Sequence, residues 1–238
     1  MESEKPWPPW TYGDIVICVL GGVLLGFIAI FLTFAILSGL FGYLDREPSD
    51  SVFYLITGTE IYAMVAVVTW LRIGKRRGVT LQDIGFRPVK LRSLLLMIPV
   101  TPVLLIVSGI AAALTAGLFG NVPDASDQLG VTSAGLSVTD LVCLLFVVAL
   151  VGPVVEEVIF RGLLYKLLRS RKGDSFAVFV SAVAFSVIHF IPLLLGVFIV
   201  MGIAFALVTE YYKSLYPAIL LHALSNALSV WVVYITVN

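Results

Sequence analysis

Long runs of apolar residues dominate the chain, and short polar segments separate them. A run of about 20 apolar residues is long enough to cross the roughly 30 Å hydrocarbon core of a bilayer as a helix. The pattern therefore predicts an all-α fold, a polytopic bundle of about seven transmembrane helices (seven or eight). The expected spans lie near residues 15–44, 52–71, 94–119, 141–155, 176–195, 196–209 and 215–237.

Residues 176–209 form one apolar run that carries no charged residue apart from a histidine. As one helix it would reach about 51 Å, which is too long for a single span. Pro192 and Gly196 mark the expected break. Each half is then short, and either could stop inside the membrane or be re-entrant.

Composition excludes a soluble domain. The chain is 60% hydrophobic and 13% charged, with a mean hydropathy of +1.06, whereas soluble domains carry about 25% charged residues. Fifteen basic residues balance fifteen acidic ones. This balance gives no basic surface for nucleic acid, so no nucleic-acid partner is expected. The lipid bilayer is the first partner that the sequence predicts.

The distribution of basic residues predicts the orientation. Residues 72–92 hold seven Lys and Arg and residues 161–172 hold five, whereas residues 93–160 hold none. By the positive-inside rule, both basic segments and the N-terminus should face the cytoplasm, and the polar loop at 120–135 should lie outside. We expect a multi-pass integral protein of the cell (plasma) membrane.

A few polar residues fall inside the predicted spans, where ionisable groups are costly and usually functional. Glu156 and His189 are equidistant from the turn between their helices, so antiparallel packing places them at the same depth. The set contains Glu156, Glu157, Arg161, His189, His222 and Asn226. Three helices thus bring polar groups to one level below the cytoplasmic surface.

Helical spacing suggests how these residues pair. Glu157 and Arg161 are four positions apart with the acid first, which favours a helical ion pair. Arg161 would neutralise Glu157 and leave Glu156 free for another role. His222 and Asn226 are also four apart and share one helix face.

A carboxylate beside an imidazole can hold and deprotonate a water molecule. A second imidazole and a carboxamide could stabilise the oxyanion that forms when this water attacks a carbonyl, which favours peptide hydrolysis. Alternatively, Glu156, His189 and His222 could bind a divalent metal such as zinc. The sequence leaves both open, so no cofactor is certain. It contains no HExxH, GxSxG or glycine-rich phosphate motif.

The three motifs Glu156-Glu157-x-x-x-Arg161, Phe185-x-x-x-His189 and His222-x-x-x-Asn226 resemble those of the CPBP family. This is the family of CAAX proteases and bacteriocin-processing enzymes, also called the ABI family. The resemblance covers roughly residues 140 to 235. It divides the chain into an N-terminal transmembrane region at 1–135, with three spans and the basic loop 72–92, and a CPBP-like catalytic helix core at 136–238.

The resemblance implies an intramembrane endopeptidase that cleaves a membrane-associated peptide or protein near the cytoplasmic side. Glu156 and His189 would hold the catalytic water, and His222 and Asn226 would lie near the oxyanion. Glu157 and Arg161 would orient the site. The alternatives are a proton-coupled transporter, since Glu and His also form proton relays, and a non-catalytic immunity or scaffold protein.

Two further features of the first spans have structural interpretations. Glu60 is expected to make a buried packing contact rather than to line a cavity. Gly22 and Gly26 have GxxxG spacing, which indicates close packing of two helices within the chain rather than a dimer interface.

Overall fold

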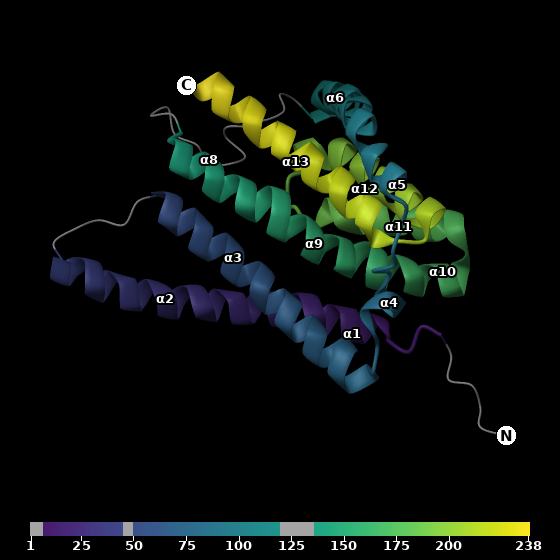
Figure 1. Ribbon diagram of the computed structural model, residues 1–238, viewed down its shortest axis with the longest axis horizontal. Coiled ribbons are helices and arrows are strands. Elements are labelled where there is room, and N and C mark those ends of the chain that lie inside the picture. Colours follow the sequence, from purple (N-terminus) through teal and green to yellow (C-terminus); the bar gives the residue numbers. More distant parts are fainter. Residues whose placement is uncertain (1–6, 45–49, 120–135) are drawn as a thin grey trace.

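A computed structural model of the chain describes residues 7–44, 50–119 and 136–238, and these residues form a bundle of helices (Figure 1). The predicted all-α membrane fold is confirmed. Several long helices contain π-helical turns, labelled η1 to η4, and η5 is a short 3₁₀ turn. The elements are α1 (Tyr12–Val16), η1 (Ile17–Gly21), α2 (Gly22–Leu44), α3 (Asp50–Thr69), η2 (Trp70–Lys75), α4 (Leu81–Ile84), α5 (Leu91–Leu95), α6 (Met97–Phe119), α8 (Val138–Leu144), η3 (Leu145–Val151), α9 (Gly152–Glu157), η4 (Val158–Tyr165), α10 (Lys166–Lys172), α11 (Asp174–Val187), η5 (Pro192–Leu194), α12 (Leu195–Tyr212) and α13 (Leu215–Val237).

Six helices in the described residues are long and apolar enough to cross a membrane. The predicted break in 176–209 is present, because α11 ends at Val187 and η5 begins at Pro192. Of the two halves, α11 is the short one, with 14 residues, and the segment Pro192–Tyr212 is long enough to span. The span expected at 141–155 is part of a longer helical segment, Val138–Lys172.

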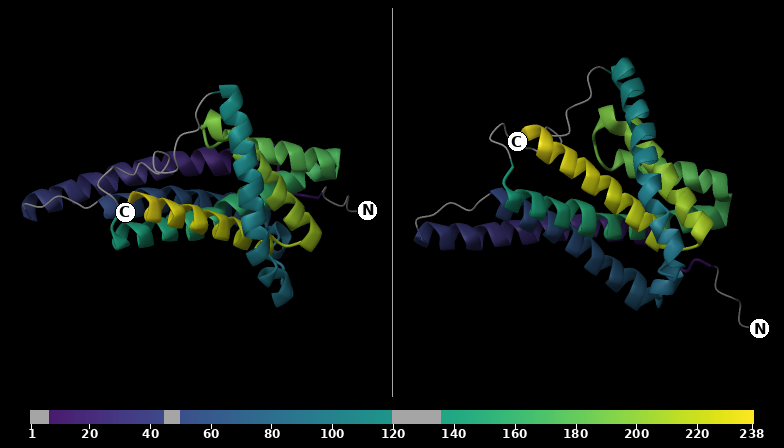
Figure 2. Two further views of the ribbon diagram at one scale, coloured as in Figure 1. Left: turned by 90° about the horizontal axis from the view of Figure 1, so that it is seen from above. Right: turned by 45° about the horizontal axis from the view of Figure 1, so that its top comes forward.

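This long segment, α8 to α10, is the centre of the bundle. One side of it packs against α3, and other sides pack against α11 and α13 (Figure 1). The helix pair α2 and α3 lies beside it, and α11 pairs with α12. Helix α6 contacts α12 and crosses α13 steeply, as the teal and yellow helices show in Figure 2. Residues on the long segment therefore contact α3, which precedes it in the chain, and α11 and α13, which follow it.

The two basic segments lie at the same end of the bundle, as the sequence predicts. Lys166 donates a hydrogen bond to the Asp83 carbonyl at 2.7 Å, and Ser214 donates to the Arg87 carbonyl, also at 2.7 Å. A short helix, α4, therefore packs on the protein at this end. The polar loop expected at 120–135 lies outside the described residues.

Helices α2 and α3 approach closely where the GxxxG spacing predicts it. A Cβ atom on Gly22 would overlap the Val65 backbone, and one on Gly26 would lie 2.8 Å from the Ile61 Cα. Thr33 also donates a 2.5 Å hydrogen bond to Glu60, so this glutamate makes the packing contact that its position suggests. The glycine contacts and the Thr33–Glu60 hydrogen bond both join α2 to α3 within one chain.

We predict that Gly22→Ala destabilises the protein by on the order of 1–3 kcal/mol, because the added methyl group overlaps backbone atoms that cannot rotate away. Gly39→Ala is the matched control, since nothing lies within 4 Å of its Cβ position on the same helix. The free energy of unfolding in mixed detergent and SDS micelles measures the difference. Equal stability of the two variants would contradict the close packing.

Candidate active site

Two adjacent glutamates on α9 have different surroundings. Glu157 is fully buried and accepts a 2.8 Å bond from Arg161, which is fully buried as well. The expected ion pair between residues four apart is therefore formed. Arg161 also donates to the Gly202 carbonyl of α12 at 2.8 Å. A Cβ atom on Gly202 would lie 2.8 Å from the Ala182 Cα, so glycine allows α11 and α12 to approach here.

Aromatic rings enclose the Arg161 guanidinium. Its central carbon lies 4.7 Å from the ring centre of Phe185, 5.2 Å from that of Phe205 and 5.9 Å from that of Phe160. A cation is attracted to the face of an aromatic ring, and the attraction is stronger where water is absent. The rings and the Glu157 carboxylate together compensate for removing this cation from water.

His222 connects the two glutamates. Its Nδ1 lies 3.0 Å from Glu157 Oε1, and its Nε2 lies 3.7 Å from Glu156 Oε2. Because an ionised carboxylate only accepts hydrogen bonds, Nδ1 carries the proton in the contact with Glu157. The ring stacks on Phe205 at 4.5 Å between centres. This contact fixes the direction of Nε2 toward Glu156.

Glu156 is the more accessible of the two acids, with 18% of its side chain exposed. Its Oε1 accepts a 2.6 Å hydrogen bond from the Tyr62 hydroxyl of α3. The sequence reasoning missed Tyr62, because a tyrosine in an apolar span reads as an ordinary packing residue. The available signal was Gly152, one turn before Glu156, which leaves room for a large neighbouring side chain.

His189 lies next to this group without contacting the glutamates. Its Nδ1 is 2.7 Å from the Phe185 carbonyl, which can only accept, so Nδ1 carries the proton and the neutral ring has a free lone pair at Nε2. Phe185 also contacts the His222 ring, at 5.7 Å between centres. In the described residues, no ion pair joins His189 to Glu156. Their cooperation on one water molecule stays a prediction.

Asn226 has a partner that the sequence analysis did not anticipate. Its Nδ2 donates a 2.8 Å hydrogen bond to the Val148 carbonyl in η3. In this π-helical turn Gly152 N–H bonds the Val147 carbonyl, and the next residue, Pro153, has no N–H to offer Val148. Asn226 satisfies the carbonyl that proline leaves free. An oxyanion role for Asn226 stays a prediction.

The three residues that could have bound a metal, Glu156, His189 and His222, do not form a metal-binding group. Among the described residues, no three His, Cys, Asp or Glu side chains form a group that could hold a metal ion. Glu156 is near His222, His189 contacts Phe185 and Phe198, and Glu157 pairs with Arg161. The geometry of these residues does not fit a Glu156, His189 and His222 metal site, and no step below uses one.

Contacts thus join Glu156, Glu157, Arg161 and His222 directly, with Phe185 linking His189 to them. Such a cluster can bind and deprotonate water beside a carbonyl group. Arg161 is also the first residue of the second basic segment.

Comparisons with known proteins agree with this chemistry. A family model described as "Type II CAAX prenyl endopeptidase Rce1-like" matches residues 138–228, which contain all six predicted site residues. The protein named "Putative membrane peptidase YdiL" from Bacillus subtilis (strain 168) is 28% identical over 192 residues, covering 78% of this chain and 76% of the relative. No solved structure matches the chain. Both matches are named as peptidases, which favours a peptidase over a proton-coupled transporter.

The account of Asn226 leads to a test by double-mutant cycle. Asn226→Ala should cost about 1 kcal/mol of unfolding free energy, because the Val148 carbonyl loses its donor. In a Pro153→Ala background the restored N–H can serve that carbonyl, so the same substitution should cost clearly less. Unfolding in mixed micelles of detergent and SDS measures the cost of Asn226→Ala in both backgrounds. An equal cost in the two backgrounds would show that proline is not the reason for the bond.

Proposed function

We propose that the chain is a membrane peptidase of the CAAX protease (CPBP) family and that it hydrolyses a peptide bond of a membrane-associated peptide or protein. One observation carries this proposal. Within the segment that matches the family model, one glutamate is neutralised by a buried arginine, and its neighbour remains partly exposed beside an imidazole. A partly exposed carboxylate can reach water, whereas a fully buried, paired one cannot.

Glu156 is the general base in this proposal. It takes a proton from a water molecule that also contacts the free Nε2 of His189, and the resulting hydroxide attacks the carbonyl carbon of the peptide bond. The carbonyl π bond opens and its electrons move to oxygen. Glu156 then passes its proton to the amide nitrogen, the C–N bond breaks, and an acid and an amine are released.

His222 is proposed to stabilise the oxyanion. Its Nδ1 is held by Glu157, so in the imidazolium form Nε2–H is the donor next to Glu156. Asn226, on the same helix as His222, attaches α13 to η3 through its hydrogen bond to the Val148 carbonyl.

The proposal predicts that Glu156→Gln abolishes cleavage, because an amide cannot accept the proton of water. Terminal proteomics of membranes from cells with wild-type protein, Glu156→Gln or no protein should show new peptide termini with the wild type only. Glu60→Gln is the control, since this intramembrane acid bonds Thr33 and lies outside the site. Identical termini with wild type and Glu156→Gln would contradict the assignment.

If cells with wild-type protein produce no new terminus while a biological effect of the gene persists in Glu156→Gln, a non-catalytic immunity or scaffold role replaces the peptidase.

We also propose that the end with the basic segments, and therefore the N-terminus, faces the cytoplasm of the cell membrane. In protein lacking Cys18 and Cys143, a cysteine replacing exposed Gln82 should resist an impermeant thiol reagent added to right-side-out vesicles. Ser137→Cys, exposed at the start of α8 on the opposite side, should react. Mass spectrometry of the labelled protein reads both. The reverse pattern would invert the topology.

A further inference from the structure

The Tyr62 hydroxyl comes from α3, outside the segment that matches the family model, and donates a 2.6 Å hydrogen bond to Glu156. It reaches Oε1, whereas Oε2 is the oxygen near His222. Because the two oxygens have different neighbours, the carboxylate plane is fixed. We propose that Tyr62 is a positioning residue of the peptidase, which holds Glu156 so that Oε2 faces the water and the imidazoles. This inference rests on the proposed function.

Two glycines make room for this contact. A Cβ atom on Gly152 would lie 3.0 Å from the Tyr62 hydroxyl oxygen and 3.1 Å from the ring carbon that bears it. On the other helix, Gly58 lies one turn before Tyr62, and a Cβ there would overlap the Val147 side chain. Glycine is therefore present on both faces where α3 meets the catalytic helix. Gly58 on α3 and Gly152 on α9 together allow the close approach that brings the Tyr62 phenol to Glu156.

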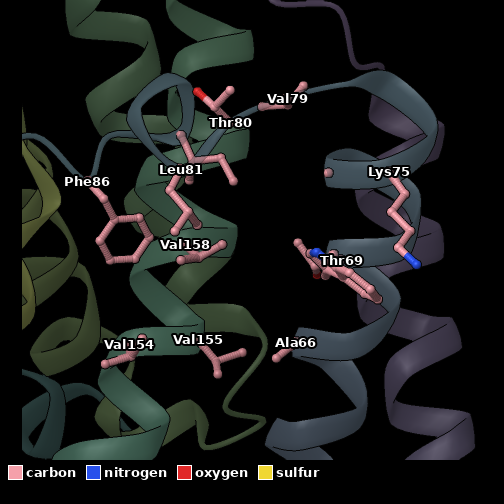
Figure 3. A pocket seen from close by; sticks show the side chains of 13 residues that line it. Ala66, Thr69, Lys75, Val79, Thr80, Leu81, Phe86, Val154, Val155 and Val158 are labelled. Carbon is pink, nitrogen blue, oxygen red and sulfur yellow. The ribbon is translucent and has the colours of Figure 1, made fainter.

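Beyond Tyr62, toward the basic end, the two helices separate around a cavity of about 520 Å³. Ala66 and Thr69 of α3 face Val155 and Val158 across it (Figure 3). Most of the lining side chains are apolar, and Thr69, Lys75 and Thr80 add polar groups. The hydrogen bond that Glu156 accepts from α3 comes from Tyr62, one turn before Ala66, next to the cavity.

The Tyr62–Glu156 bond also has a chemical consequence. A neutral phenol donates a hydrogen bond without neutralising the carboxylate, unlike the Arg161 guanidinium on Glu157. Glu156 can therefore be oriented and still accept a proton at Oε2. Removing the hydroxyl frees rotation of the carboxylate and should slow the chemical step more than it weakens substrate binding.

The test compares Tyr62→Phe with wild type on a synthetic peptide that spans the cleavage site found by terminal proteomics. We expect kcat to fall about 10- to 100-fold, the usual loss when the partner that orients a reacting group is removed, with KM changed less than twofold. Rates are normalised to the folded fraction measured by unfolding in mixed micelles. Tyr165→Phe is the matched control, because it removes a 2.8 Å hydroxyl bond to Glu210, away from the site.

The outcomes separate this inference from the proposed function. If the wild type cleaves, Glu156→Gln does not, and Tyr62→Phe keeps the wild-type kcat, Tyr62 has no positioning role and the peptidase assignment stands. A rise in KM at unchanged kcat, or an equal loss of kcat in Tyr165→Phe, would also overturn the inference. If the wild type cleaves no peptide, the proposed function fails and the inference fails with it.

Discussion

A carboxylate and a guanidinium that are both shielded from solvent, those of Glu157 and Arg161, hold three helices at one level of the bundle. Removing two charges from water costs several kcal/mol for each ion, and that cost is met only where further partners surround the pair. Here the partners are the Gly202 carbonyl of α12, His222 of α13 and the aromatic rings around Arg161. These contacts bury Glu157 and pair its Oε1 with Arg161 and His222, so the adjacent, partly exposed Glu156 is the acid that we propose acts on water.

Both regions of the chain contribute to the group around Glu156. The segment that matches the family model supplies the acids, the arginine and the imidazoles, and α3 supplies the Tyr62 hydroxyl. The irregular turn η3 belongs to the same arrangement, since Pro153 leaves the Val148 carbonyl free and Asn226 binds it from α13. Glycines at positions 58 and 152 bring α3 close enough to take part.

The sequence predicts the features that depend on spacing along one helix. The membrane spans, the break before Pro192 and the Glu157–Arg161 pair all follow from runs of apolar residues or from a separation of four. Counting residues from a turn gives depth but not the direction around the helix axis, so it could not show that His222 Nε2 lies 3.7 Å from Glu156 Oε2. Tyr62 escaped prediction because its partner is 94 positions away, and only the packing of α3 on α9 joins them.

The division of roles between the two adjacent acids is the central claim, and the turnover numbers and unfolding free energies of Glu156→Gln and Glu157→Gln test it most directly. The account predicts that Glu156→Gln loses turnover while its stability stays close to wild type. It predicts that Glu157→Gln loses about 3 kcal/mol or more of stability, because Arg161 is left buried without its counter-charge. Wild-type turnover in Glu156→Gln, or unchanged stability in Glu157→Gln, would contradict it.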